Sequence, residues 1–244
     1  MISVARVRAL HSRYNESDLR HERIREYDYI QEPRDTGYRS IHLVYEYFTE
    51  NKAKEPYNGL LIEVQLRSRL QHAWATAVEA IDIFTGQGLK GSEGDERWLR
   101  FFALMGSAMA LRERTPTVEG TPSSSAELRK ELRQVVKELN VVPRLQSYHV
   151  ALIEMTDGAP QAKTSYFLVE LQPSMNRVSV TRFAKREVER ANEEYLKAEK
   201  ALAGEPGAQA VLVSVEDIEA LKRAYPSYFL DTGRFIDAVM SAIA

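Results

Sequence analysis

The alternation of apolar and polar residues over 60–67 constrains the fold most, because a period of two is typical of a strand with two unlike faces. Glu63, Gln65 and Arg67 fall on one face, and the apolar residues between them fall on the other. A second strand is predicted over 39–48, which is rich in β-branched and aromatic residues. We expect these two strands to be antiparallel neighbours joined by a long polar loop.

Other segments show the spacing of further strands and helices. A strand is expected over 24–30, because Pro33 cannot donate a hydrogen bond to a ladder and ends it. Apolar residues at steps of three and four predict helices over 3–14, 69–84, 96–112 and 126–140. Further along the chain we expect strands over 147–155, 164–171, 177–183 and 211–215, and helices over 185–202, 215–224 and 232–243. The predicted fold class is therefore α+β, with an antiparallel or mixed sheet flanked by helices.

The segment 115–125 is rich in Thr, Pro, Ser and Gly, which is typical of a linker. We predict that it separates two parts of the chain. The first part, 1–114, contains the three strands described above. The second part, 126–244, is a helix followed by a small α+β module whose role the sequence does not indicate.

The composition excludes several classes of protein. With 244 residues, 44% of them hydrophobic and 28% charged, the chain can bury a sizeable core. A net charge of −2 gives no overall attraction to nucleic acid, although clusters of arginine can still bind a nucleotide. The absence of cysteine excludes disulfides and zinc–thiolate sites. No apolar run is long enough to span a bilayer, so we expect a cytoplasmic protein.

A glycine turn at 35–37 is surrounded by an aromatic ring and cations, which suits the binding of a nucleotide. The ring of Tyr38 can stack on a base, although a tyrosine packed at the start of a strand is the commoner case. Arg34, Arg39 and Arg67 can bind phosphate oxygens through the guanidinium group. Solvated surface charge is the alternative for each arginine.

Glu63 is the residue of this set that is best suited to catalysis or metal binding. A carboxylate on the polar strand face can hold Mg²⁺ or act as a base toward a ribose hydroxyl, whereas a solvent-facing strand residue is the ordinary alternative. His42 alternates with Ile41 and Leu43, so it shares a strand face with Ser40 and Val44. It is either a site residue or a histidine satisfied within the core or at its edge.

Together these residues resemble the synthetase signature of the RelA/SpoT family. That signature combines Asp-Tyr-Ile, Pro-Lys, Gly-Tyr-x-Ser-x-His and Glu-Val-Gln-Ile-Arg-Thr. The matching segments here are 28–30, 33–34, 37–42 and 63–68. Residues 71–76 are also similar to the helix that follows the glutamate strand in small alarmone synthetases.

The resemblance implies an activity and a role for each site residue. The activity is the transfer of pyrophosphate from ATP to the 3′ hydroxyl of GDP or GTP, on a nucleotidyltransferase-like fold. Tyr38 would stack on guanine and His42 would contact the acceptor nucleotide. Glu63 would coordinate Mg²⁺ and help to activate the hydroxyl. Acceptor phosphates would meet Arg34, which stands where the family usually has lysine. The two residues that would support the glutamate are Gln65 and Arg67.

Departures from the family pattern leave other functions open. Tyr27 stands where the family often has lysine, and residues 1–26 contain neither the basic ATP-binding segment nor the second metal carboxylate in recognisable form. We therefore expect an N-terminally truncated synthetase domain over 1–114 that is incomplete as an enzyme. The alternatives are a non-catalytic regulatory protein that binds guanine nucleotides and a toxin of the same fold that pyrophosphorylates tRNA. A homo-oligomer is compatible with each of them.

Overall fold

The structure is a computed structural model that describes residues 3–86, 88–91, 94–156, 164–172, 175, 177–205, 207–216 and 228–244. It confirms the predicted α+β class. The first elements are α1 (Val4–Glu16), β1 (Glu22–Asp28), β2 (Ile41–Glu46), β3 (Leu61–Leu66), α2 (Arg69–Thr85) and α3 (Glu96–Glu113). They are followed by α4 (Ser125–Glu138), α5 (Val141–Thr156), β4 (Thr164–Gln172), β5 (Arg177–Ala184), α6 (Val188–Leu202), β6 (Gln209–Ser214) and α8 (Tyr228–Ile243).

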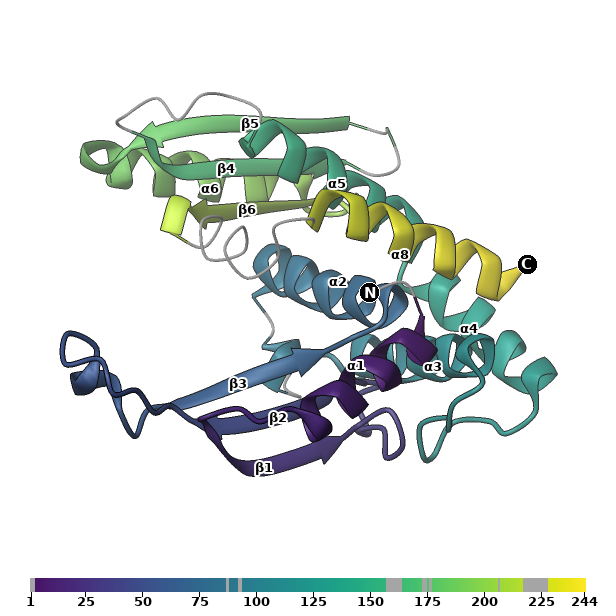
Figure 1. Ribbon diagram of the computed structural model, residues 1–244. Coiled ribbons are helices and arrows are strands. Elements are labelled where there is room, and N and C mark those ends of the chain that lie inside the picture. The colour runs from purple at the N-terminus through teal and green to yellow at the C-terminus, as the bar shows by residue number, and fades with distance from the viewer. Residues whose placement is uncertain are drawn as a thin grey trace. The chain divides into compact units, whose positions relative to one another are not determined.

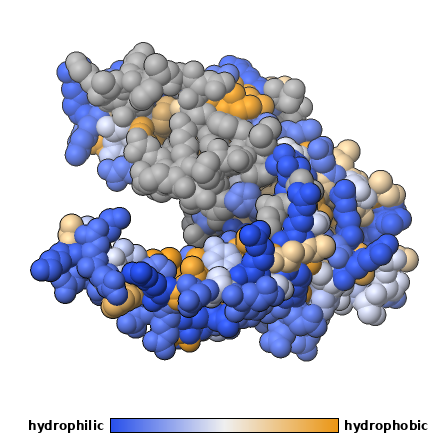
Figure 2. Space-filling view, viewed as in Figure 1, coloured by the Kyte–Doolittle hydropathy of each residue, from blue (hydrophilic) through white to orange (hydrophobic). Residues whose placement is uncertain are grey.

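The chain forms two compact units, one made of Met1–His72 and Phe102–Leu128 and the other of Ala73–Phe101 and Arg129–Ala244. Helices α2 and α3 each contribute to both units. The domains predicted from the sequence, 1–114 and 126–244, stay a prediction. The visible surface of the described residues is mostly hydrophilic, and apolar side chains form only small patches on it (Figure 2).

In the first unit, β1, β2 and β3 form an antiparallel sheet with β2 in the centre (Figure 1). The predicted pairing of the second and third strands is confirmed, with His42 opposite Gln65 and Val44 opposite Glu63. One face of the sheet is apolar and packs against α1. Its buried core consists of Val7, Ile30, Ile41, Leu43, Tyr45 and Leu66. The opposite face carries His42, Glu63 and Gln65, and we call it the polar face of the sheet.

The turn before β2 packs against α3 through two glycines. Gly37 has a φ of +96°, and a Cβ atom there would lie 2.5 Å from the carbonyl oxygen of Phe102. A Cβ atom on Gly106 would lie 2.6 Å from the Cα atom of Gly37. The backbones of the turn and the helix therefore touch directly, and this contact fixes the position of the turn that carries Tyr38.

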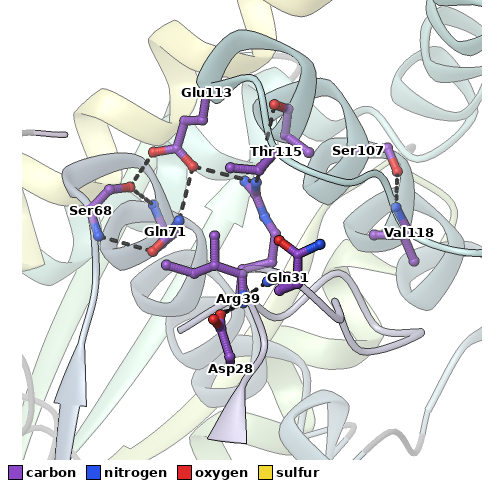
Figure 3. Close-up of polar contacts among 11 residues, drawn as sticks. Asp28, Gln31, Arg39, Ser68, Gln71, Ser107, Glu113, Thr115 and Val118 are labelled. Carbon is purple, nitrogen blue, oxygen red and sulfur yellow. Dashed lines mark hydrogen bonds and ion pairs between the residues drawn. The ribbon is translucent and has the colours of Figure 1, made fainter. Parts of the chain in front are cut away.

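A buried polar network joins the start of β2 to the end of α3 and the start of α2 (Figure 3). Arg39 Nη1 lies 3.4 Å from Glu113 Oε2 and donates to Thr115 at 2.9 Å. The other carboxylate oxygen of Glu113 accepts from the Ser68 hydroxyl, and Gln71 Nε2 donates to the same carboxylate at 3.0 Å. Ser68 and Gln71 also form the reciprocal hydrogen bonds of a capping box at the start of α2.

In the second unit, an antiparallel sheet of order β5-β4-β6 has α5 on one face and α6 on the other (Figure 1). Residues of alternate parity on β4 face opposite sides, so Leu168 packs with Phe183, Ala191 and Ala198 on the α6 side. The predicted strands over 164–171, 177–183 and 211–215 are confirmed within one or two residues.

The strand predicted over 147–155 is wrong, because these residues belong to α5. Pro143 is tolerated in the first turn of a helix, where its missing N–H costs nothing. The buried residues follow helical steps of three and four: Leu145, Tyr148, Ala151, Leu152 and Met155. The helix predicted over 215–224 lies mostly outside the described residues.

No helix in the described part of the chain is long and apolar enough to cross a membrane. This agrees with the sequence, in which no apolar run reaches the length of a bilayer span.

We expect Gly106→Ala to lower the free energy of unfolding by about 1–3 kcal/mol, because the added methyl group would push the backbones of α3 and the 35–38 turn apart. Chemical denaturation would measure the change. Gly233→Ala is the matched control, since Gly233 also lies in a helix but has nothing within 4 Å of an added Cβ. Alanine there should be neutral or stabilising because of its higher helix propensity. Equal stability of the Gly106 variant and the wild type would contradict the tight contact.

Candidate functional site

Four residues on or beside the polar face form a continuous hydrogen-bonded chain. Arg67 Nη2 donates to the hydroxyl of Tyr38 at 2.7 Å, and this hydroxyl lies 2.6 Å from Nε2 of His42. The other ring nitrogen of His42, Nδ1, contacts Oε1 of Glu63. The carboxylate can only accept, so Nδ1 carries the proton and Nε2 accepts from the Tyr38 hydroxyl. The order of donation is therefore Arg67 to Tyr38 to His42 to Glu63.

Gln65 supports both ends of this chain. Its amide nitrogen donates to Oε2 of Glu63 at 3.0 Å, and its carbonyl oxygen accepts from Arg67. Both carboxylate oxygens of Glu63 thus have a donor, yet the Glu63 side chain is 44% exposed while that of His42 is 11% exposed. The carboxylate is the member of the chain that a ligand can reach most easily.

Burial lowers the pKa of His42 below its ordinary value. The carboxylate of Glu63 raises the pKa in return, but Arg67 and Arg34 lower it further, and the net direction is downward. His42 is therefore neutral at neutral pH, which agrees with the tautomer that the hydrogen bonds require. Because the imidazole of His42 is neutral, it does not compensate the negative charge of Glu63.

Arg34 lies beside this chain and is held by Tyr29. Its Nη2 donates to the Tyr29 hydroxyl at 2.6 Å, and its Cζ lies 4.4 Å from the centroid of the Tyr29 ring. The remaining N–H groups of this exposed guanidinium can face a ligand. The sequence analysis did not single out Tyr29 as a site residue. The available signal was its place in the 28–30 segment. Because β1 ends at Asp28, the alternation of the strand does not show on which side the Tyr29 ring lies.

Arg39 is not brought into this group. Its side chain is buried and contacts Glu113 and Thr115 (Figure 3). A guanidinium that already meets a carboxylate and Thr115 in the interior has a structural role here. The structure therefore brings together six of the seven residues predicted from the sequence: Arg34, Tyr38, His42, Glu63, Gln65 and Arg67.

The described residues contain no group of three or more His, Cys, Asp or Glu side chains that could hold a metal ion. Among the six residues that the structure brings together, Glu63 carries the carboxylate. One carboxylate is enough for Mg²⁺ when substrate phosphates and water supply the other ligands, so the residues fit a magnesium–nucleotide complex better than a permanently bound metal.

Comparison with known proteins identifies this part of the chain. Residues 5–84 match the family model described as the region found in RelA / SpoT proteins. The match covers about a third of the 244 residues, and this segment is similar to the RelA/SpoT region. The RelA/SpoT region covers α1, the three strands and most of α2, and so contains all six residues of the group. It supports a function of the (p)ppGpp synthetase type. No curated protein matches the chain.

The lowered pKa of His42 predicts a pH dependence of stability. A histidine that is harder to protonate in the folded state than in the unfolded state contributes stability above the unfolded pKa of about 6.5, and this contribution is lost as the pH falls through the folded pKa. We expect the free energy of unfolding to fall between about pH 7.5 and about pH 5.5, and to fall less in His42→Gln.

Denaturant titrations at both pH values would measure this difference. His149, whose pKa burial also lowers, is present in both proteins, so its contribution cancels. An identical pH dependence in the wild type and His42→Gln would show that folding does not change the pKa of His42.

Proposed function

We propose that the polar face binds GDP or GTP as an acceptor, and that the protein takes part in the transfer of pyrophosphate from ATP to the 3′ hydroxyl of this nucleotide. The observation that supports the proposal is the hydrogen-bonded chain from Tyr38 through His42 to Glu63, which lies within the RelA/SpoT region. It joins a ring suited to stacking with a carboxylate suited to activating a hydroxyl.

Each end of the chain suits a different part of the acceptor. The half-buried ring of Tyr38 has its hydroxyl fixed by Arg67 and His42, so a guanine base would stack on a ring that is already in position. The exposed guanidinium of Arg34 would meet the phosphates of the acceptor. The carboxylate of Glu63 would then face the ribose of the nucleotide.

In the proposed reaction the 3′ oxygen of the acceptor bonds to the β-phosphorus of ATP. The bond between that phosphorus and the oxygen leading to the α-phosphorus breaks, and AMP leaves. Glu63 accepts the proton of the 3′ hydroxyl, while Gln65 and the neutral His42 hold the carboxylate in place. Bound Mg²⁺, held by Glu63 and the phosphates, would neutralise phosphate charge.

The first test is calorimetric titration of the protein with GDP and Mg²⁺. Removing the stacking ring in Tyr38→Ala should weaken binding by about 1–3 kcal/mol, which is about 5- to 150-fold. Tyr57→Ala is the matched control, because Tyr57 is a tyrosine of the same unit that is 57% exposed and lies outside the group. The proposal fails if the folded wild type does not bind GDP, or if both variants bind it equally well.

A second acceptor, the 3′ end of a tRNA, is favoured by two residues of β1. Tyr27 is 40% exposed and stacks on Tyr29 at 5.7 Å between ring centroids. Arg25 lies two residues away on the same strand face, and no ion pair involves it among the residues that the structure describes. An additional ring and an additional cation beside the nucleotide site suit a further base and phosphate.

Incubation with ATP labelled in the β- and γ-phosphates, GDP and tRNA together would distinguish the two acceptors. Label in GDP that Glu63→Gln lowers at least about 100-fold would support the first acceptor, because this variant keeps the shape of the side chain but removes its basicity. Label in tRNA that Tyr27→Ala reduces would support the second acceptor instead. Binding of GDP without labelling of either acceptor would support a non-catalytic regulatory protein.

A further inference from the structure

Tyr29 is in contact with three residues of the proposed acceptor site. Its ring lies edge-on to His42, with centroids 5.2 Å apart and planes at 90°. It also meets Tyr38 at 6.0 Å and 65°. The guanidinium of Arg34 lies over the same ring and donates to its hydroxyl. Tyr29 therefore touches the stacking ring, the central imidazole and the exposed cation of the site.

The backbone holds Tyr29 firmly at this position. Its N–H donates to the carbonyl oxygen of Ser40 at 2.9 Å, which ties it to the segment before β2. The preceding residue, Asp28, accepts from the N–H groups of Ile30 and Gln31 at 3.1 and 3.0 Å and is also paired with Arg8. The Tyr29 ring thus extends from a turn whose backbone is fixed by hydrogen bonds to Ser40 and to Asp28.

We propose that Tyr29 is a positioning residue that fixes Arg34 and His42 for the acceptor nucleotide, an inference that rests on the proposed function. Its hydroxyl and ring face orient Arg34, and its ring edge orients His42. An exposed arginine normally loses much side-chain freedom on binding a phosphate. Arg34 is already held by a hydrogen bond and a cation–π contact, so less freedom remains to be lost.

The two functions of Tyr29 can be separated by substitution. Tyr29→Phe removes only the hydroxyl, so it releases the hydrogen bond to Arg34 but keeps the ring edge against His42. We expect it to weaken the binding of GDP about 3- to 10-fold, and to leave the binding of guanosine, which has no phosphate, unchanged. Arg34→Ala should weaken GDP binding at least as much and should remove any further effect of Tyr29→Phe.

Tyr29→Leu removes the ring itself and so acts on His42 as well. Loss of the ring removes the edge-on contacts with His42 and Tyr38, so this variant should weaken the binding of guanosine as well as that of GDP. Tyr29→Phe keeps both ring contacts and should leave the binding of guanosine unchanged. Calorimetric titration with guanosine therefore separates the two variants.

Tyr27 supplies the matched control. It stacks on Tyr29 at 5.7 Å and 3° and lies opposite His42 in the sheet, yet within the described residues its side chain makes no hydrogen bond or ring contact with Arg34 or His42. Tyr27→Phe and Tyr27→Leu should leave the affinities for GDP and guanosine at the wild-type values. The inference is overturned if Tyr29→Phe binds GDP as tightly as the wild type, or if it weakens guanosine and GDP equally. It is also overturned if Tyr29→Leu leaves the binding of guanosine unchanged.

These outcomes are separate from those of the proposed function. A wild type that does not bind GDP overturns the acceptor site, and the role of Tyr29 toward a nucleotide with it. A wild type that binds GDP, together with Tyr29 variants that behave like the wild type, overturns this inference alone.

Discussion

The arrangement of the polar face depends on the buried ion pair between Arg39 and Glu113. Two charges removed from water are costly unless hydrogen bonds satisfy them, and Ser68, Gln71 and Thr115 provide these bonds. The pair joins the start of β2 to the ends of two helices. Because Tyr38 immediately precedes Arg39 in the sequence, anchoring Arg39 also fixes the position of the tyrosine. The contact of Gly37 with Gly106 holds the same turn at a second point.

On the polar face itself, the balance between burial and charge determines the protonation of His42. Burial disfavours the imidazolium, and the neighbouring arginines act in the same direction, so the single carboxylate of Glu63 does not charge the ring. The ring then passes a hydrogen bond from Tyr38 to Glu63 instead of forming an ion pair with Glu63.

Much of this arrangement could be read from the sequence, because the strand period and the turn signal are local. The alternation over 60–67 placed Glu63 and Gln65 on one face, and the structure has them there. The position of Arg39 could not be read in this way, because its partner Glu113 lies far along the chain and only the folded structure brings them together. The α5 helix shows the opposite limit. Its β-branched and aromatic residues suggested a strand, and the burial of Leu145, Tyr148 and Leu152 overrides that local preference.

The hydrogen bonds within the polar face also indicate the order in which a ligand would engage it. Arg67, Gln65 and Tyr38 already satisfy one another, so a nucleotide that used them would have to exchange existing bonds for new ones of similar strength. The guanidinium of Arg34 and the carboxylate of Glu63 are exposed and can gain contacts without breaking the chain. Recognition should therefore begin with a phosphate at Arg34 and a hydroxyl or metal ion at Glu63. Stacking on Tyr38 would then add affinity without any change in the hydrogen bonds beneath the ring.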